Sequence, residues 1–156
     1  MDGKFRTTKQ YLNQLVNIDK RIKDKIKEAE MWRDIAGRTG GGNNSERVQT
    51  TKRYDKMGDA ISSAVDYEQE SERLAKELVE IKNTIIQQID GIEDQLHYNI
   101  LKDYYIHEMA LVEIAAQEHY SYKQMGRHFK NALNDFEHRY GSTYLRNDVP
   151  KCPQMS

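Results

Sequence analysis

The sequence predicts an all-α protein, in which a long antiparallel helical hairpin is followed by a small helix-turn-helix unit. Three observations predict this class. Apolar residues recur at three- and four-residue steps along most of the chain, which is the spacing of one helical face. The 156 residues include two prolines, and 31% are charged, as expected of helices with a large exposed surface. The mean hydropathy of −0.93 is low, but this periodicity argues against global disorder.

The first periodic segment predicts one helix from Thr8 to Ala36. Its apolar residues form a single stripe, which contains Leu12, Leu15, Ile18, Ile22, Ile26 and Ala29. We expect Thr7 or Thr8 to cap its start and Gly37 to end it. The stretch GRTGGGNNSER at 37–47 then predicts a surface loop. It lacks the Gly-Lys-Ser/Thr sequence of a phosphate-binding loop.

The second periodic segment predicts a longer helix, from Asp55 to Ile89. At 1.5 Å per residue it would be a rod of roughly 50 Å, and an isolated rod would leave its apolar stripe in water. It must therefore pack against the first helix, a second copy, or both. The sequence thus predicts a hairpin over 8–89 that mediates self-association or contact with another protein. We expect a homodimer, because the stripe exceeds what one partner helix covers.

The rest of the chain predicts three shorter helices, over 92–105, Ala110–Glu118 and Ser121–Tyr140. The Gly91 position separates them from the hairpin, since glycine weakens a helix interior. We interpret 92–140 as one unit. The tail over 141–156 contains both prolines and little periodicity, so we expect it to be mobile.

The spacing inside this unit is typical of a helix-turn-helix. Ile114 and Ala115 supply the apolar residue and the small residue needed where two short helices cross. The turn falls at His119 and Tyr120, Ser121 caps the second helix, and Met125 faces back into the core. In such motifs the second helix can lie in the major groove of DNA.

The exposed face of that second helix predicts an interface with double-stranded DNA. Its candidate residues are Tyr122, Lys123, Gln124, Gly126, Arg127, Lys130 and Asn131. We expect Arg127 to read a base, because arginine suits guanine edges. Lys123 and Lys130 are expected to contact phosphates, which position the protein without specifying sequence. Gly126 either allows close approach to the DNA backbone or is simply tolerated.

Short motifs here resemble a known family. EIA, SYKQM and NAL resemble the DNA-reading motif in the fourth conserved region of primary sigma factors, and ILKDYYI resembles the segment before it. With the N-terminal YLNQLVNIDKRI, residues 10–138 more closely resemble the RinA-like and ArpU-like late-gene transcription regulators of Gram-positive phages. The resemblance implies a phage or prophage activator of packaging and structural genes that recruits host RNA polymerase. It places the base-reading face at Tyr122, Lys123, Gly126 and Arg127.

Three residues depart from the family pattern. His119 stands at the turn position that usually holds glycine, and Glu118 replaces the apolar residue before it. His128 occupies an apolar position late in the second helix. These departures affect how tightly the turn can close and how well the apolar core beneath it packs, and both bear on the strength of DNA binding.

The sequence predicts no enzyme, cofactor or metal site. The single cysteine, Cys152, excludes an internal disulfide and a cysteine-based zinc cluster. The five histidines do not form a His-Glu-x-x-His motif. No apolar run approaches the roughly 20 residues that cross a bilayer, and the first residues do not resemble a signal peptide. We therefore expect no membrane contact and a cytoplasmic location, in the host cell if the protein is phage-encoded.

A second interpretation stays open, because the net charge is −1 and residues 61–102 hold nine acidic residues against four basic ones. In it the protein is a non-enzymatic interaction module, or a phage-encoded inhibitor of a host system, whose helix-turn-helix does not read DNA. The acidic face over 66–94 would then contact the partner. Salt dependence separates the two interpretations, since DNA binding weakens steeply as salt rises.

Overall fold

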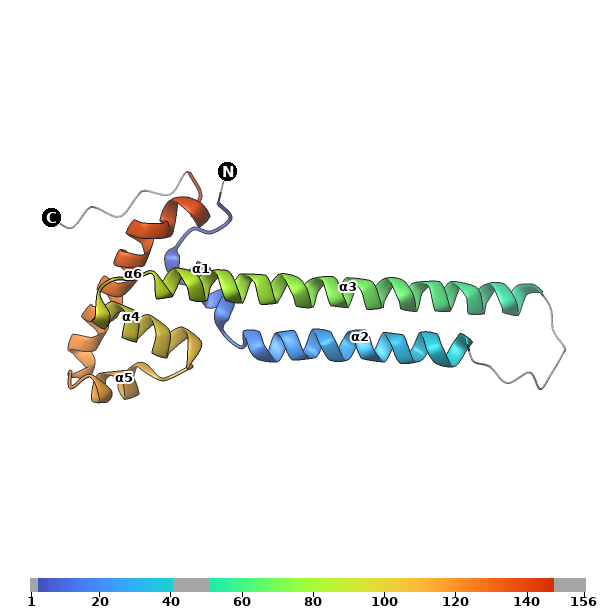
Figure 1. The fold of residues 1–156 in the computed structure, drawn as a ribbon, viewed down its shortest axis with the longest axis horizontal. Helices are drawn as coiled ribbons and strands as arrows, with labels where there is room; N and C mark the ends of the chain where they lie inside the picture. Colours follow the sequence, from blue (N-terminus) through green and yellow to red (C-terminus); the bar gives the residue numbers. More distant parts are fainter. Residues whose placement is uncertain (1–2, 41–50, 148–156) are drawn as a thin grey trace. The chain divides into compact units, whose positions relative to one another are not determined.

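The computed structural model describes residues 3–40 and 51–147, with side chains for 3–37 and 58–147. The prediction of an all-α protein is confirmed. The helices in chain order are α1 (Thr8–Leu12), the 3-10 helix η1 (Asn13–Leu15), α2 (Ile18–Gly40), α3 (Thr51–Asp90), α4 (Gln95–Leu101), the π-helix η2 (Lys102–Ile106), α5 (Leu111–Gln117) and α6 (Tyr122–Tyr144), as Figure 1 shows. No described helix is long and apolar enough to cross a membrane.

The chain forms two compact units. The first unit combines the residues up to Val16 with those from Ile81 onward, and the second unit is Asn17–Glu80. These bounds differ from the division at 89–92 that the sequence suggests. The reason is that the N-terminal residues pack on α6, and the last ten residues of α3 belong with them.

The prediction of one helix from Thr8 to Ala36 is wrong, because the chain breaks after η1. Asn17 adopts a left-handed conformation with φ of 57°, which asparagine tolerates better than most residues. A new helix, α2, starts at Ile18 and continues past Gly37 to Gly40. The predicted loop at 37–47 is therefore helical at its start, and its residues beyond Gly40 lie outside the described part of the chain.

The N-terminal segment is tied to the end of α6. The Thr8 hydroxyl donates to Glu137 Oε1 at 3.0 Å and lies 2.6 Å from the Tyr144 hydroxyl. The Tyr11 ring stacks on Tyr144 with centroids 4.0 Å apart. Phe5 also forms an isolated bridge with Leu145. These contacts order a segment far from α6 in the sequence.

The same contacts correct the prediction of a mobile tail from residue 141. Gly141 and Tyr144 are buried residues of α6, which ends at Tyr144 rather than Tyr140. Residues 148–156, the remainder of that predicted tail, lie outside the described part.

The helix predicted over 92–105 begins later and changes its winding. Asp94 caps α4, because its Oδ1 accepts from the His97 backbone N–H at 3.0 Å. From Lys102 the chain continues as the π-helix η2, which ends at Ile106. Such π-turns are rare in proteins. Tyr105 is buried within η2.

In the second unit α2 and α3 run antiparallel and side by side (Figure 1). Arg33 of α2 donates to Glu68 at 2.7 Å and to Glu72 at 2.8 Å on α3. The Trp32 and Tyr67 rings lie 4.8 Å apart. The buried residues along this pair include three alanines, Ala29, Ala64 and Ala75.

Candidate nucleic-acid interface

The candidate site lies on α5, α6 and the four residues between them. The start of α6 is fixed by a capping box. The Ser121 Oγ accepts from the Gln124 backbone N–H at 3.2 Å, and the Ser121 N–H donates to Gln124 Oε1 at 3.0 Å. Ser121 is therefore the cap that the sequence predicts. Gln124 is one of the residues predicted to contact DNA. Its side-chain oxygen accepts a hydrogen bond in this capping box, so its amide N–H groups are the part of the side chain that can face a ligand.

The turn between α5 and α6 keeps a tight shape in spite of the departures in its sequence. His119 has φ of 61°, the left-handed conformation that glycine adopts most easily. Tyr120 N–H donates to Ala115 O at 2.9 Å and closes the turn. Glu118, at the end of α5, accepts from Asn99 Nδ2 at 3.3 Å. Histidine thus occupies the glycine position at a cost of about 1–2 kcal/mol.

The core beneath this turn is apolar. Ile114, Ala115 and Met125 are buried, as the spacing of the sequence predicts. The Tyr104 and Tyr105 rings lie 4.8 and 6.2 Å from the Phe129 ring on α6. The ring of His128, the third departure, is tilted against Tyr120 with centroids 4.5 Å apart. Ring contacts from η2 and from the turn therefore fix the position of α6.

Tyr105 places a polar group in this core. Its side chain is 3% exposed, and its hydroxyl finds no hydrogen-bond partner among the described residues. Burial raises the pKa of Tyr105 well above the ordinary value of a phenol. Tyr105 is therefore a neutral core residue at physiological pH.

Three cations lie on the outward side of α6. Lys123, Arg127 and Lys130 are exposed, and their three- and four-residue spacing places them opposite the buried stripe that holds Met125 and Phe129. Within the described part of the chain none of the three forms an ion pair. Their charges are therefore available to an anionic partner.

Three other arginines of the protein are engaged in ion pairs. Arg33 pairs with Glu68 and Glu72, and Arg73 pairs with Glu70 and Glu77. Arg139, near the other end of α6, pairs with Glu93 at 2.9 Å. Arg127 differs from these three, because no described acidic residue lies within ion-pair distance of it.

The remaining predicted residues differ in exposure. Tyr122 is 62% exposed at the first position of α6, and Asn131 is half-buried. Gly126 is exposed, and a Cβ added to it would meet no atom within 4 Å. Internal packing therefore does not require glycine there.

The sequence did not indicate Val112 on α5, which is an apolar residue with 59% exposure. The sequence could have indicated this exposure, because Val112 lies outside the helix face formed by the buried residues Ile114 and Ala115.

Two histidines of the first unit contact carboxylates. His97 Nδ1 lies 2.8 Å from Asp135 Oδ2, and His107 Nδ1 lies 2.9 Å from Asp103 Oδ1. Among the described residues no group of three or more His, Cys, Asp or Glu side chains is placed to hold a metal ion.

No family model, curated protein or solved structure matches the chain. The resemblance to phage late-gene regulators thus depends on the short motifs quoted above. The arrangement of α5 and α6 is therefore the main structural feature that bears on function.

Proposed function

We propose that this protein is a phage or prophage transcriptional regulator that places α6 in the major groove of double-stranded DNA. One observation carries the proposal: α6 presents Lys123, Arg127 and Lys130 on one exposed side, and none of them pairs with an acidic residue that the structure describes. A helix with exposed cations on its outward face matches the major groove in width and in charge.

The candidate residues take different roles in this proposal. The planar fork of Arg127 donates two hydrogen bonds to a guanine edge. Lys123 and Lys130 contact phosphates on either side and set the register. The exposed ring of Tyr122 and the amide N–H groups of Gln124 lie in the first turn of α6, where reading helices contact base edges. Asn131, one turn beyond Arg127, is a further candidate for adenine.

The regulatory role follows from the resemblance. The protein would activate late packaging and structural genes by recruiting host RNA polymerase, and it would do so in the host cytoplasm. The proposal assigns it no enzymatic activity, cofactor or metal. It includes a homodimer, because α2 and α3 expose apolar residues such as Ile26 and Val79.

Replacing Arg127 by alanine should weaken specific DNA binding about 5- to 150-fold, because a bidentate contact to guanine contributes roughly 1–3 kcal/mol. The measurement is a mobility shift on phage intergenic DNA at two salt concentrations. Arg146→Ala is the matched control, since Arg146 is an exposed arginine of the same unit outside α6. Its affinity should stay within about twofold of wild type.

Two outcomes of this experiment would contradict the proposal. In one, wild-type protein binds no DNA at low salt, which favours the alternative of an interaction module or inhibitor. In the other, Arg127→Ala and Arg146→Ala lose the same affinity, which means that binding follows total charge rather than the α6 face.

Replacing Gly126 by alanine should raise the free energy of unfolding by about 0.5–1 kcal/mol, because alanine is the better helix former and its Cβ meets no atom of the protein. The same methyl group should lower DNA affinity, since the proposal places DNA against this face. Gly58→Ala is the matched control, because an added Cβ there also meets nothing within 4 Å. Chemical denaturation and the mobility shift measure both effects. Unchanged DNA affinity in Gly126→Ala would remove Gly126 from the interface.

A further inference from the structure

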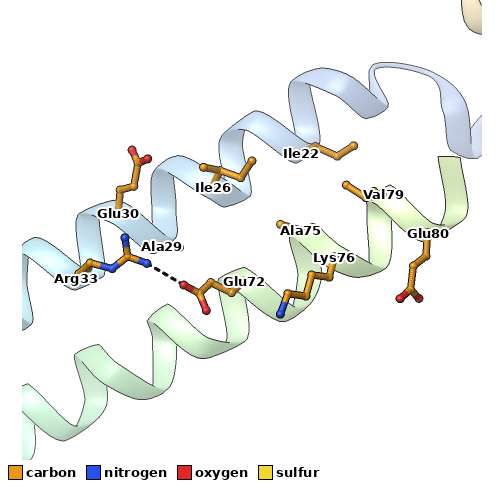
Figure 2. Close-up of a pocket in the computed structure, with 10 residues that line it drawn as sticks. All are labelled: Ile22, Ile26, Ala29, Glu30, Arg33, Glu72, Ala75, Lys76, Val79 and Glu80. Atoms are coloured by element: carbon orange, nitrogen blue, oxygen red, sulfur yellow. Dashed lines mark hydrogen bonds and ion pairs between the residues drawn. The ribbon is translucent and has the colours of Figure 1, made fainter. Parts of the chain in front are cut away.

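An apolar groove lies between α2 and α3 in the second unit. Its volume is about 640 Å³. Figure 2 shows Ile22 and Ile26 on one helix and Ala75 and Val79 on the other, and Ala29 completes the apolar lining. Ile26 is 47% exposed and Val79 is 40% exposed. The pair of helices therefore leaves an apolar strip in contact with water, which favours covering it with another apolar surface.

Charge is distributed unevenly along the same pair of helices. The basic end, which we define as residues 18–27 and 73–80, carries seven basic and four acidic residues. The acidic end, residues 28–37 and 58–72, carries one basic and eight acidic residues. Residues 38–57, whose side chains lie outside the described part, add five basic and two acidic residues to the sequence. Residues 28–72, which combine the acidic end with this segment, still hold more acidic than basic residues.

We propose that the groove is the interface with a second copy of this chain, arranged antiparallel. A two-fold axis perpendicular to the helices, at the centre of the groove, puts the basic end of each copy against the acidic end of the other. A parallel arrangement would put the two acidic ends together, and like charges facing each other across an interface are costly. The apolar strips of both copies then cover one another at the centre, and each strip contributes the same residues.

The charge pattern favours this occupant over nucleic acid. The groove continues into the acidic end, where Glu72 at its border already pairs with Arg33 (Figure 2). A phosphate backbone along both ends would pass the acidic end, where Glu30 and Glu72 line the groove, whereas a second copy offers the matching basic end. The inference builds on the homodimer in the proposed function and is independent of DNA binding.

Sedimentation velocity of the full chain without DNA, over a range of protein concentrations, tests the location of the interface. We expect wild type to be a dimer and Ile26→Glu to be a monomer. Met31→Glu is the matched control: Met31 lies on the same helix with the same 47% exposure but does not line the groove, so this variant should remain a dimer. Circular dichroism verifies that both variants are folded, and Val79→Lys replaces Ile26→Glu if that variant is not.

Disulfide crosslinking tests the antiparallel orientation. The two-fold axis places α3 of one copy against α3 of the other. Glu80 lies in the basic end of α3 and Glu72 in its acidic end, and both line the groove. In a Cys152→Ser background, a mixture of Glu72→Cys and Glu80→Cys chains should form the mixed disulfide on mild oxidation, identified by mass. Same-variant disulfides alone would overturn the antiparallel arrangement.

In sedimentation, a wild-type chain that is monomeric at every concentration, or equal loss of the dimer in Met31→Glu, would overturn the interface. Because no DNA is present, none of these results depends on the DNA-binding proposal.

Discussion

Replacing Phe136 by alanine should lower the free energy of unfolding by about 3–5 kcal/mol, the cost of emptying a fully buried aromatic site. Phe136 is 0% exposed. Its ring lies 6.1 Å from Tyr11, 5.0 Å from Tyr140 and 6.0 Å from Tyr144. The large expected effect follows because these rings join the N-terminal segment to α6, and a cavity at Phe136 loosens both. Urea unfolding followed by circular dichroism measures the change.

Two matched variants separate the cavity from other effects. Phe136→Leu keeps much of the volume and should lose less than Phe136→Ala. His138→Ala changes an exposed residue of the same helix and should stay within about 0.5 kcal/mol of wild type. A loss below about 1 kcal/mol in Phe136→Ala would mean that the N-terminal segment is not docked on α6. The near-ultraviolet signal of the tyrosines should also change in Phe136→Ala, because the packing of their rings depends on Phe136.

Local patterns in the sequence were sufficient to predict several helices but not the break in the first one. The α3 helix was predicted within four residues at its start and one at its end. The apolar stripe of the first segment keeps its spacing through Leu15, Ile18 and Ile22, whether or not the helix is continuous. The left-handed turn at Asn17 depends on one residue, so the periodicity carried no sign of it.

Long-range packing was beyond what the sequence could predict. Thr8 and Tyr11 contact Tyr144 through a hydroxyl pair and stacked rings, and more than 130 residues separate these partners. Periodicity describes one helix face at a time and does not say which faces meet. For this reason the N-terminal segment was assigned to the hairpin, and the end of α6 was assigned to a tail.

The outward direction of the candidate residues on α6 could be predicted, because it depends on spacing within one helix. Met125 and Phe129 define the buried side of α6, and this fixes the outward direction of Lys123, Arg127 and Lys130. The role of Gln124 was available from the sequence but was missed. Ser121 followed three residues later by Gln124 is the signature of a capping box, which engages the glutamine side chain with the backbone.

Replacing Lys123, Arg127 and Lys130 together by glutamine should lower the affinity for double-stranded DNA by roughly 10²–10³-fold at 0.1 M salt. Each cation that neutralises a phosphate releases counterions, so the logarithm of affinity falls with the logarithm of salt by about 0.9 per contact. Up to three lost contacts should therefore make this slope less steep by up to about 2.7. Binding isotherms by fluorescence anisotropy at four or more salt concentrations give both the affinity and the slope.

The slope distinguishes a specific face from the total charge of the protein. A control variant with Arg6, Lys9 and Arg146 replaced by glutamine removes three exposed cations of the same unit that lie outside α6. It has the same net charge as the α6 variant, but its slope should match wild type, because these residues release no counterions if they contact no phosphate. Equal slopes for both variants would mean that α6 does not lie along the DNA backbone. A flatter slope in the α6 variant alone assigns the released counterions to Lys123, Arg127 and Lys130, which only a DNA contact through α6 explains.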